Sequence, residues 1–281
     1  MTRVVTYEHP KDFLARAETW LLEREAEHNL ILSLAYARAA KEEQEPDVLY
    51  ATIESASVLG CVMRTPPHKL LITDLPDEAA EALTATLVDL YEDIPAVLGP
   101  SGPAEAVAMA WVARRGGGWR PGMEQGIYRL REVIPPRPVP GSLRAATVDD
   151  LDLAVEWGAG FARDSGVMFP TKRESVEGWV EREDLHIWEL DGEPVSIAVA
   201  QGATPGGARV GYVYTPPEHR KRGYASACVA ALSQKVLDRG ADFCVLYTDL
   251  ANPTSNAIYQ RLGYELVAEV RDVDLIAEGQ S

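Results

Sequence analysis

Residues 210–240 read VGYVYTPPEHRKRGYASACVAALSQKVLDRG, and they are the most informative part of the sequence. The first five residues are apolar or aromatic and predict a strand, which Thr-Pro-Pro at 215–217 ends because proline donates no hydrogen bond to a neighbouring strand. Beyond the turn, apolar residues recur at helical spacing, at Ala225, Cys228, Val229, Leu232 and Val236. Gly240 stands where a helix-terminating glycine belongs. A basic turn that contains glycine therefore joins a strand to a helix.

The turn itself reads RKRGYA at 220–225. The first amides of a helix have no partner within the helix and lie at the positive end of its dipole, so they can bind phosphate oxygens. Gly223 lets the backbone approach a ligand closely, and Arg220 and Arg222 add positive charge. An ordinary solvated basic turn is the alternative, because a short motif is informative only in its structural context. Here that context, a strand before and a helix after, is present.

The turn resembles the pyrophosphate loop of the GNAT superfamily of CoA-dependent acyltransferases. That loop reads Arg/Gln-x-x-Gly-x-Gly/Ala between a strand and a helix, and Arg220, Gly223 and Ala225 occupy its fixed positions. The approach at 214–220 is also similar to that of many members. The resemblance implies an α/β (α+β) fold with a mixed, mostly antiparallel central sheet flanked by helices. It also implies acetyl-CoA as the acyl donor, with no metal.

The resemblance also implies which residues hold the cofactor. The family separates two central strands, so that backbone groups of the strand before the loop bind pantetheine; here these are Val213 and Tyr214. The amides of residues 222–225 would bind the pyrophosphate, inside the basic turn that also contains Arg220 and Lys221. By name, the loop residues are Arg220, Lys221, Arg222, Gly223, Tyr224 and Ala225.

A second informative segment, NPTSNAIYQRLGY at 252–264, follows a strand predicted at 242–250. Asn252 is a good helix N-cap with proline at the first helical position, and Gly263 is a good stop. The spacing of three residues puts Asn256 and Tyr259 on one helix face. On the residues alone, Tyr259 can equally be a packing residue and Asn256 a turn residue.

In GNAT enzymes this helix carries the pattern Asn-x-x-x-Asn-x-x-Tyr-x-x-x-Gly-Phe/Tyr, which the segment matches with Asn252, Asn256, Tyr259, Gly263 and Tyr264. The resemblance implies that Asn252 or Asn256 binds the CoA arm. It also implies that Tyr259 gives a proton to the departing thiolate. A phenol is a neutral donor at pH 7 and is chemically suited to that role.

Composition limits the other possibilities. The 281 residues carry a formal net charge of −16, which argues against a nucleic-acid binder and leans toward a cationic acceptor. Residues 1–3 do not resemble a signal peptide, and no apolar run approaches the ~20 residues that span a membrane, so we expect a cytoplasmic protein. Cys61, Cys228 and Cys244 have no zinc-site spacing, and the latter two are predicted to be buried packing residues.

The length predicts two domains. The first half shows helices, three strands, helix, strand, helix and strand, which is also the order of the second half. We place a stiff, proline-rich linker at 135–141, a catalytic domain at 142–281, and a degenerate GNAT-like copy at 1–134. The loop of the first copy reads TDLPDE at 73–78, and its acidic residues would repel a pyrophosphate. We therefore expect the first half not to bind CoA.

Shorter signals place the remaining elements of the second half. Thr147 with Asp150, and Thr171 with Glu174, resemble capping boxes that begin helices at 149–162 and 172–183. Asp191-Gly192 predicts a tight hairpin between strands at 185–190 and 194–200. A strand pair at 265–270 and 273–276 is predicted to close the domain.

The sequence does not name the base that deprotonates an amine acceptor. Candidates by position are Glu189, Glu193, Asp249, His186 and His219, with Glu218 read as a loop residue. Five large side chains lie in helical segments that cover the acceptor site in this family: Trp157, Phe161, Met168, Phe169 and Trp179. Core packing explains each of them singly, whereas together they suggest an apolar wall of the acceptor pocket.

The leading interpretation is an N-acetyltransferase in which an amine of a small molecule or peptide attacks acetyl-CoA directly. The alternative is a non-catalytic acyl-CoA sensor or interaction module. A nucleotide-binding protein is disfavoured because the sequence contains neither GxxxxGK[ST] nor GxGxxG. The acceptor and the oligomeric state, including a possible homodimer, stay open.

Overall fold

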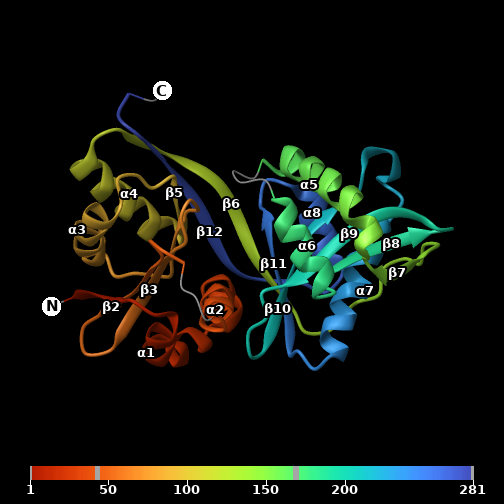
Figure 1. Cartoon of the computed structure of the whole chain (residues 1–281), viewed down its shortest axis with the longest axis horizontal. Helices are drawn as coiled ribbons and strands as arrows, with labels where there is room; N and C mark the ends of the chain where they lie inside the picture. The colour runs from red at the N-terminus through yellow and green to blue at the C-terminus, as the bar shows by residue number, and fades with distance from the viewer. Residues whose placement is uncertain (1, 42–44, 167–170, 280–281) are drawn as a thin grey trace. The chain divides into compact units, whose positions relative to one another are not determined.

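The computed structural model describes residues 2–41, 45–166 and 171–279 (Figure 1). The chain divides into two compact units. The first contains residues 1–127, 249–251 and 267–281, and the second contains residues 128–248 and 252–266. The division therefore falls at residue 127/128, not at the proline-rich segment 135–141, and the C-terminal residues belong to the first unit.

Among the described residues, the four helices of the first unit and all but one of its strands come from the first half of the sequence. Its elements are β1 (Arg3–Tyr7), α1 (Pro10–Leu22), α2 (Glu25–Ala39), β2 (Leu49–Glu54), β3 (Val58–Arg64), β4 (Leu70–Ile72), α3 (Ala79–Leu90), β5 (Ala96–Gly99), α4 (Ser101–Arg115) and β6 (Gly118–Leu130), with β12 (Glu265–Ile276) from the C-terminus. The strand order is β1-β2-β3-β4-β5-β12-β6. Neighbouring pairs from β1 to β4 are antiparallel, and β4 and β5 are parallel.

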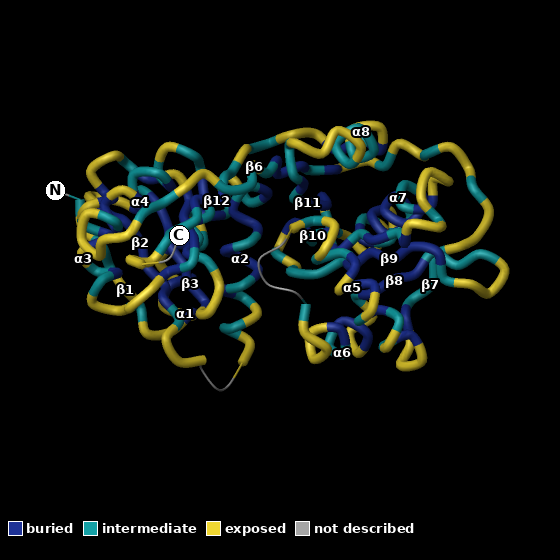
Figure 2. Tube along the Cα trace, turned by 90° about the horizontal axis from the view of Figure 1, so that it is seen from above, coloured by how far each residue is buried: buried dark blue, intermediate teal, exposed yellow. Residues whose placement is uncertain are grey.

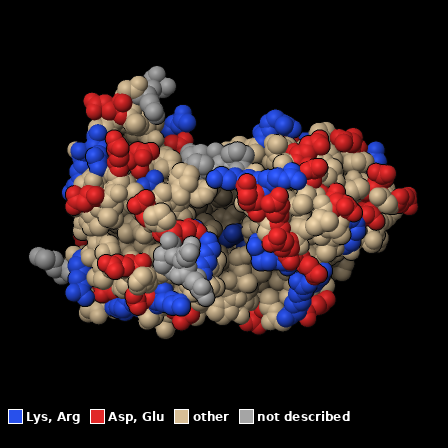
Figure 3. Space-filling model, viewed as in Figure 1, with Lys and Arg blue, Asp and Glu red and all other residues tan. Residues whose placement is uncertain are grey.

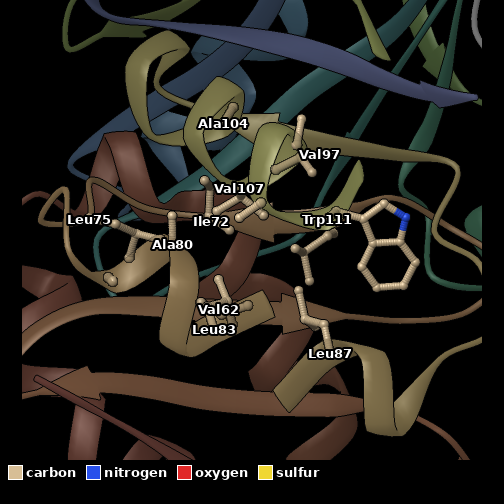
Figure 4. Packing of buried hydrophobic residues seen from close by; sticks show 14 of the residues in the cluster. Val62, Ile72, Leu75, Ala80, Leu83, Leu87, Val97, Ala104, Val107 and Trp111 are labelled. Carbon is tan, nitrogen blue, oxygen red and sulfur yellow. The ribbon is translucent and has the colours of Figure 1, made fainter. Parts of the chain in front are cut away.

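Two helix pairs cover the two faces of this sheet. In β2, Leu49, Ala51 and Ile53 face α3 and α4, while Tyr50 faces α1 and α2, as the period of two along a strand requires. Figure 4 shows the α3–α4 side, where side chains of both helices meet those of the strands beneath them. The labelled residues are Val62, Ile72, Leu75, Ala80, Leu83, Leu87, Val97, Ala104, Val107 and Trp111.

The C-terminal strand completes the first unit. β12 pairs antiparallel with β5, with Arg271 opposite Gly99 and Asp274 opposite Ala96. Val273 is fully buried in the core, and Lys69 Nζ lies 2.6 Å from Asp272 Oδ2. The predicted strand pair at 265–270 and 273–276 is wrong, because one continuous strand spans both. The polar residues between them are held in extended backbone by ion pairs and do not form a turn.

The elements of the second unit follow one another in the same order as the first elements of the chain. Its elements are β7 (Ser142–Ala145), α5 (Leu151–Ser165), α6 (Arg173–Glu181), β8 (Leu185–Leu190), β9 (Glu193–Gln201), β10 (Gly207–Tyr214), α7 (Tyr224–Asp238), β11 (Phe243–Asp249) and α8 (Pro253–Arg261), with short 3-10 turns at Val148–Asp150 and Pro217–His219. The strand order is β6-β11-β10-β9-β8-β7, with β10 and β11 parallel. Both halves thus read strand, two helices, three strands, helix, strand, helix, strand.

Helices again cover both faces. Ala198, Val210 and Leu246 pack against α7, whereas Ile197 and Val199 pack against α5 and α6. Figure 2 shows β8 and β9 as buried chain between these layers. The hairpin at 191–192 is confirmed, since Asp191 and Gly192 have φ of 52° and 86°.

The two predicted capping boxes have different outcomes. At Val148–Asp150 the box is present, and the Thr147 amide donates to Asp150 Oδ2 over 2.8 Å. The second prediction is wrong, because α6 begins at Arg173 with Lys172 as N-cap and no side-chain cap bond.

The proline-rich segment is packed within the second unit. The Trp188 indole Nε1 donates to the Pro140 carbonyl over 3.0 Å, and the Ile134 amide donates to the Leu262 carbonyl over 2.9 Å. Residues 135–141 therefore lie inside the second unit and are not the stiff linker between two domains that their composition predicts.

Charge and hydropathy add two observations. Figure 3 shows basic and acidic side chains interspersed on one face. Over the part of the chain that is described, no helix has both the length and the apolar character needed to cross a membrane.

Candidate functional site

The loop between β10 and α7 forms the expected turn. Gly223 has φ of 89° and caps α7, and Lys221 also has a positive φ, of 62°. A Cβ on Gly223 would lie 2.9 Å from Val139 Cγ1, so glycine is required there both for backbone conformation and for space. The Ala227 amide donates to the Gly223 carbonyl over 3.0 Å, which leaves the preceding amides of the helix start without a partner inside α7.

A cavity of about 670 Å³ lies against this loop, entirely within the second unit. It is lined by Pro135, Pro136, Arg137, Pro138, Val139, Lys221, Arg222, Gly223, Ser226, Ile258, Arg261 and Leu262. Four of these residues are basic and none is acidic. Among the described residues, no carboxylate lies within ion-pair distance of Arg137, Lys221, Arg222 or Arg261. In a chain of net charge −16, this concentration of unpaired cations suits a polyanionic ligand.

Arg220, a fixed position of the sequence motif, does not line the cavity. Its Nε donates to the Thr215 carbonyl over 2.9 Å, its Nη2 pairs with Asp164 of α5, and its guanidinium lies 5.7 Å from the centre of the Tyr214 ring. In this structure Arg220 therefore braces the loop against α5. Tyr224 is buried, and Ala225 is half-buried at the start of α7.

Strands β10 and β11 run together only at their beginnings. Their parallel register covers Gly207 to Arg209, after which β10 has a bulge between Gly211 and Tyr214, with Tyr212 at φ of 53°. Val213 and Tyr214 lie beyond the paired part, as the resemblance implies for the pantetheine-binding backbone. The Tyr214 carbonyl accepts a hydrogen bond from Ser196 Oγ over 3.1 Å.

Helix α8 presents the second motif. Asn252 is the N-cap, and its side chain accepts a hydrogen bond from the Ser255 amide over 3.1 Å, while the Asn256 amide donates to the Asn252 carbonyl. Tyr259 is half-buried, with its ring centre 6.0 Å from that of Tyr264. Burial raises the pKa of Tyr259 to about 12, so its phenol keeps its proton at neutral pH.

Sequence reasoning missed the polar cavity residues Arg137, Ser226 and Arg261, as well as the apolar residues of the lining. Arg261 lies three residues after Ile258 and shares its helix face, on the side of α8 that lines the cavity. Two features of the sequence could have pointed to these arginines. Arg137 is the single charged residue within 134–141, and Arg261 stands two positions before Gly263.

The structure favours none of the candidate bases. The His186 ring lies between the Asp184 carbonyl, 3.3 Å from Nδ1, and Lys235 Nζ, 2.7 Å from Nε2, and burial lowers its pKa. Glu189 pairs with Arg144, and Asp249 accepts a hydrogen bond from the Ala251 amide over 2.8 Å.

The remaining candidates lie at the surface or in turns. Glu193 and Glu218 are exposed, at the hairpin and beside the loop respectively. His219 is half-buried in a 3-10 turn, with its ring centre 6.4 Å from that of Tyr224.

The aromatic residues gather around the bulge of β10. Trp179 and Phe161 contact Tyr212, with ring centres 4.8 and 5.2 Å away, and Trp157 contacts Tyr214 at 6.2 Å. They form one packed cluster between β10 and the helices α5 and α6. Met168 and Phe169 lie outside the described residues.

The cysteines and metal-ligand residues offer no further site. All three cysteines are buried, and burial raises the pKa of Cys228 and of Cys244 to about 12, so neither is a reactive thiolate. Across the residues with described positions, no group of three or more His, Cys, Asp or Glu side chains is arranged to hold a metal ion.

Comparison with known proteins identifies the fold. Residues 191–272, which include the loop and α8, match the model of the FR47-like protein family. A Drosophila protein structure is 12% identical with a TM-score of 0.68, covering 98% of this chain and 99% of that one. A GCN5-related N-acetyltransferase from Sphaerobacter thermophilus is 16% identical with a TM-score of 0.62, covering 99% and 96%. No curated protein matches the sequence.

The tandem arrangement also has a counterpart. A tandem GNAT protein from the clavulanic acid biosynthesis pathway is 15% identical with a TM-score of 0.52, and the match covers 98% of both chains. The chain therefore has the GNAT fold, built here from two units of the same element order. The resemblance to the GNAT superfamily is confirmed at the level of the fold.

Proposed function

We propose that this protein is an N-acetyltransferase whose second unit binds acetyl-CoA at the start of α7. The observation that carries the proposal is the cavity beside Gly223, where free helix-start amides and four unpaired basic residues meet. Phosphate groups match both features, because amides at a helix start and arginine side chains each donate to phosphate oxygens. Beyond Arg209 the recorded pairing of β10 with β11 ends, so the β11 side of Val213 and Tyr214 is proposed to receive the pantetheine arm.

The chemistry follows from the neighbouring helix. A neutral acceptor amine attacks the thioester carbonyl carbon, the carbon–sulfur bond breaks, and the thiolate takes a proton from Tyr259 Oη. The amine loses one proton as the amide forms, and a proton from solvent restores the Tyr259 phenol. The raised pKa of Tyr259 keeps the phenol protonated at neutral pH, so that the donor is present before transfer. The buried cysteines are poor nucleophiles, which favours direct transfer over a covalent acetyl-enzyme.

The first unit is proposed not to bind CoA. The turn between β4 and α3 carries Asp74, Asp77 and Glu78, and Leu75 of the same turn is buried in the core. Glu78 is the N-cap of α3 and Glu81 stands in its first turn, so carboxylates already occupy the positive end of that helix.

A thiol-release assay tests the proposal. The purified protein is incubated with acetyl-CoA and a panel of amines that includes polyamines, amino acids and short peptides, and free CoA thiol is titrated with a chromogenic disulfide. We expect release with at least one amine and none with Gly223→Glu, which places a carboxylate in the phosphate site. Tight acetyl-CoA binding without release across the panel would instead favour the acyl-CoA sensor.

A further inference from the structure

The four cations of the cavity come from three separate segments. Lys221 and Arg222 belong to the loop, whereas Arg137 comes from the proline-rich segment and Arg261 from the last turn of α8. All four side chains are exposed. Several other arginines of the second unit do pair with carboxylates, namely Arg144, Arg173, Arg182, Arg220 and Arg239. The four cations of the cavity are thus not neutralised by a neighbouring carboxylate, unlike these five arginines.

The two loop cations and the other two differ in what surrounds them. Lys221 and Arg222 stand beside the free amides at the start of α7, so they complete a site for the pyrophosphate diester. Arg137 and Arg261 belong to other segments, the proline-rich segment and the last turn of α8. The same cavity is lined by the half-buried apolar side chains of Ile258 and Val139, which offer a surface to an adenine ring.

We propose that Arg137 and Arg261 bind the 3′-phosphate of coenzyme A and make the site selective for the 3′-phosphorylated cofactor. This inference rests on the proposed function. A phosphate monoester carries a charge of about −1.5 to −2 at pH 7 and offers three acceptor oxygens, more than either phosphate of the diester bridge. Two arginine forks converging from different segments match such a group, because each guanidinium can donate two parallel hydrogen bonds.

The proposal also gives the proline-rich segment a function. Residues 135–139 form one wall of the cavity, and Val139 packs against Gly223. The hydrogen bonds from Ile134 to Leu262 and from Trp188 to Pro140 fix both ends of this segment. Arg137 is thereby held on a stiff support, which lowers the entropy lost when it binds a phosphate.

Calorimetric titration with acetyl-CoA and with 3′-dephospho-acetyl-CoA tests the proposal on the full chain. We expect the dephospho compound to bind about ten-fold or more weakly, since two charged hydrogen-bonding groups lose their partner. Arg137→Gln and Arg261→Gln should each weaken acetyl-CoA binding about three- to ten-fold and leave dephospho binding nearly unchanged. The double variant should bind both compounds alike.

Arg131→Gln is the matched control, because Arg131 is an exposed arginine of the same unit that does not line this cavity. It should leave both affinities unchanged. Equal binding of the two compounds by the unaltered protein would overturn the inference, as would a uniform loss for both compounds in the Arg137 and Arg261 variants. Failure of both compounds to bind would overturn the proposed function itself. If Arg261 acted only on the dipole of α8, Arg261→Gln would change the free energy of unfolding but not the ratio of the affinities for acetyl-CoA and its dephospho form, and this result would also overturn the inference.

Discussion

At the scale of single residues, Tyr259 is the proposed proton donor for the departing thiolate. Replacing it by phenylalanine keeps the ring, and hence its contact with Tyr264, but removes the proton donor. We expect the rate of acetyl transfer to fall about 100-fold or more, because loss of a general acid typically has that effect. Acetyl-CoA affinity should stay nearly unchanged. Steady-state kinetics and calorimetry check the two effects separately, and an unchanged rate would exclude this role.

The pKa of Tyr259 predicts the alkaline side of the rate profile. Burial disfavours the phenolate and raises the pKa to about 12, so the proton donor is present at every pH below that value. The rate should therefore show no loss centred near pH 10, the ordinary pKa of tyrosine. A loss near pH 10 that is absent from Tyr259→Phe would contradict the raised pKa of Tyr259.

Local spacing explains which site residues could be predicted. The loop at 220–225 and the helix face with Tyr259 could be predicted from residues close together in the sequence, because each lies on one continuous stretch of chain. Arg137 and Arg261 could not be placed, since the fold brings them together from distant segments. The same holds for Arg220, whose partner Asp164 lies 56 residues away along the chain.

At the scale of elements, two glycines let α5 pack closely on β10. A Cβ on Gly158 would clash with the Tyr212 hydroxyl, and one on Gly160 would clash with that of Tyr214. We expect Gly158→Ala to lower the free energy of unfolding by about 1–3 kcal/mol through overpacking. Adding Tyr212→Phe removes the clashing oxygen and should restore part of the loss. Denaturant titrations of the single and double variants measure this, and strictly additive losses would contradict the explanation.

The start of α5 depends on Asp150. Its carboxylate accepts hydrogen bonds from Arg144 at 2.7 and 2.9 Å and from the Thr147 amide at 2.8 Å. The Arg144 guanidinium, with help from that amide, lowers the pKa of Asp150 below its ordinary value. A lowered pKa in the folded state stabilises the protein above the unfolded pKa of about 3.9, and the stabilisation is lost as pH falls through the folded value.

We therefore expect Asp150→Asn to cost about 1–3 kcal/mol of unfolding free energy at pH 7 and much less at pH 2. Asp152→Asn, on the exposed side of α5, is the control and should cost about 0.5 kcal/mol or less at either pH. Urea unfolding across this pH range gives the comparison. An Asp150→Asn loss that does not depend on pH would show that the charge is not the cause.

Element prediction succeeded where the local signal was strong. The hairpin at 191–192 and helix α7 carry turn residues and apolar spacing that no tertiary contact overrides. Strand β1 was missed because it is five residues long and its burial pattern is set by pairing with β2. The break expected within β12 is absent because Asp272 finds Lys69, a partner 203 residues away.

At the scale of the whole molecule, the first unit is completed by a strand from the other half of the sequence. β12 ends the second half but pairs antiparallel with β5, and residues 267–281 belong to the first unit. The two units therefore do not follow a single cut in the sequence, such as the boundary expected from composition at 135–141. Composition reports local stiffness, whereas a domain boundary is set by which distant strands pair.

Because most of β12 belongs to the first unit, we expect this C-terminal strand to stabilise that unit. Val273 lies in the same core as Trp111, so Val273→Ala should lower the unfolding free energy of that unit by about 1–3 kcal/mol. Leu266→Ala, at an exposed position of the same strand, is the control and should have little effect. Denaturant titration reports both losses. Equal losses in the two variants would argue against burial of β12 in that core.

The most direct test of the whole account is a calorimetric titration of the full chain with acetyl-CoA. One site per chain is expected because, of the two strand-to-helix loops at 73–78 and 220–225, the second has a glycine turn beside unpaired cations, whereas the first has neither glycine nor a basic residue. Gly223→Glu should abolish binding, whereas Asp77→Asn in the corresponding turn of the first unit should not change it. Two sites would contradict the assignment of the first unit as a degenerate copy, and no binding would leave the GNAT fold without its acetyl donor.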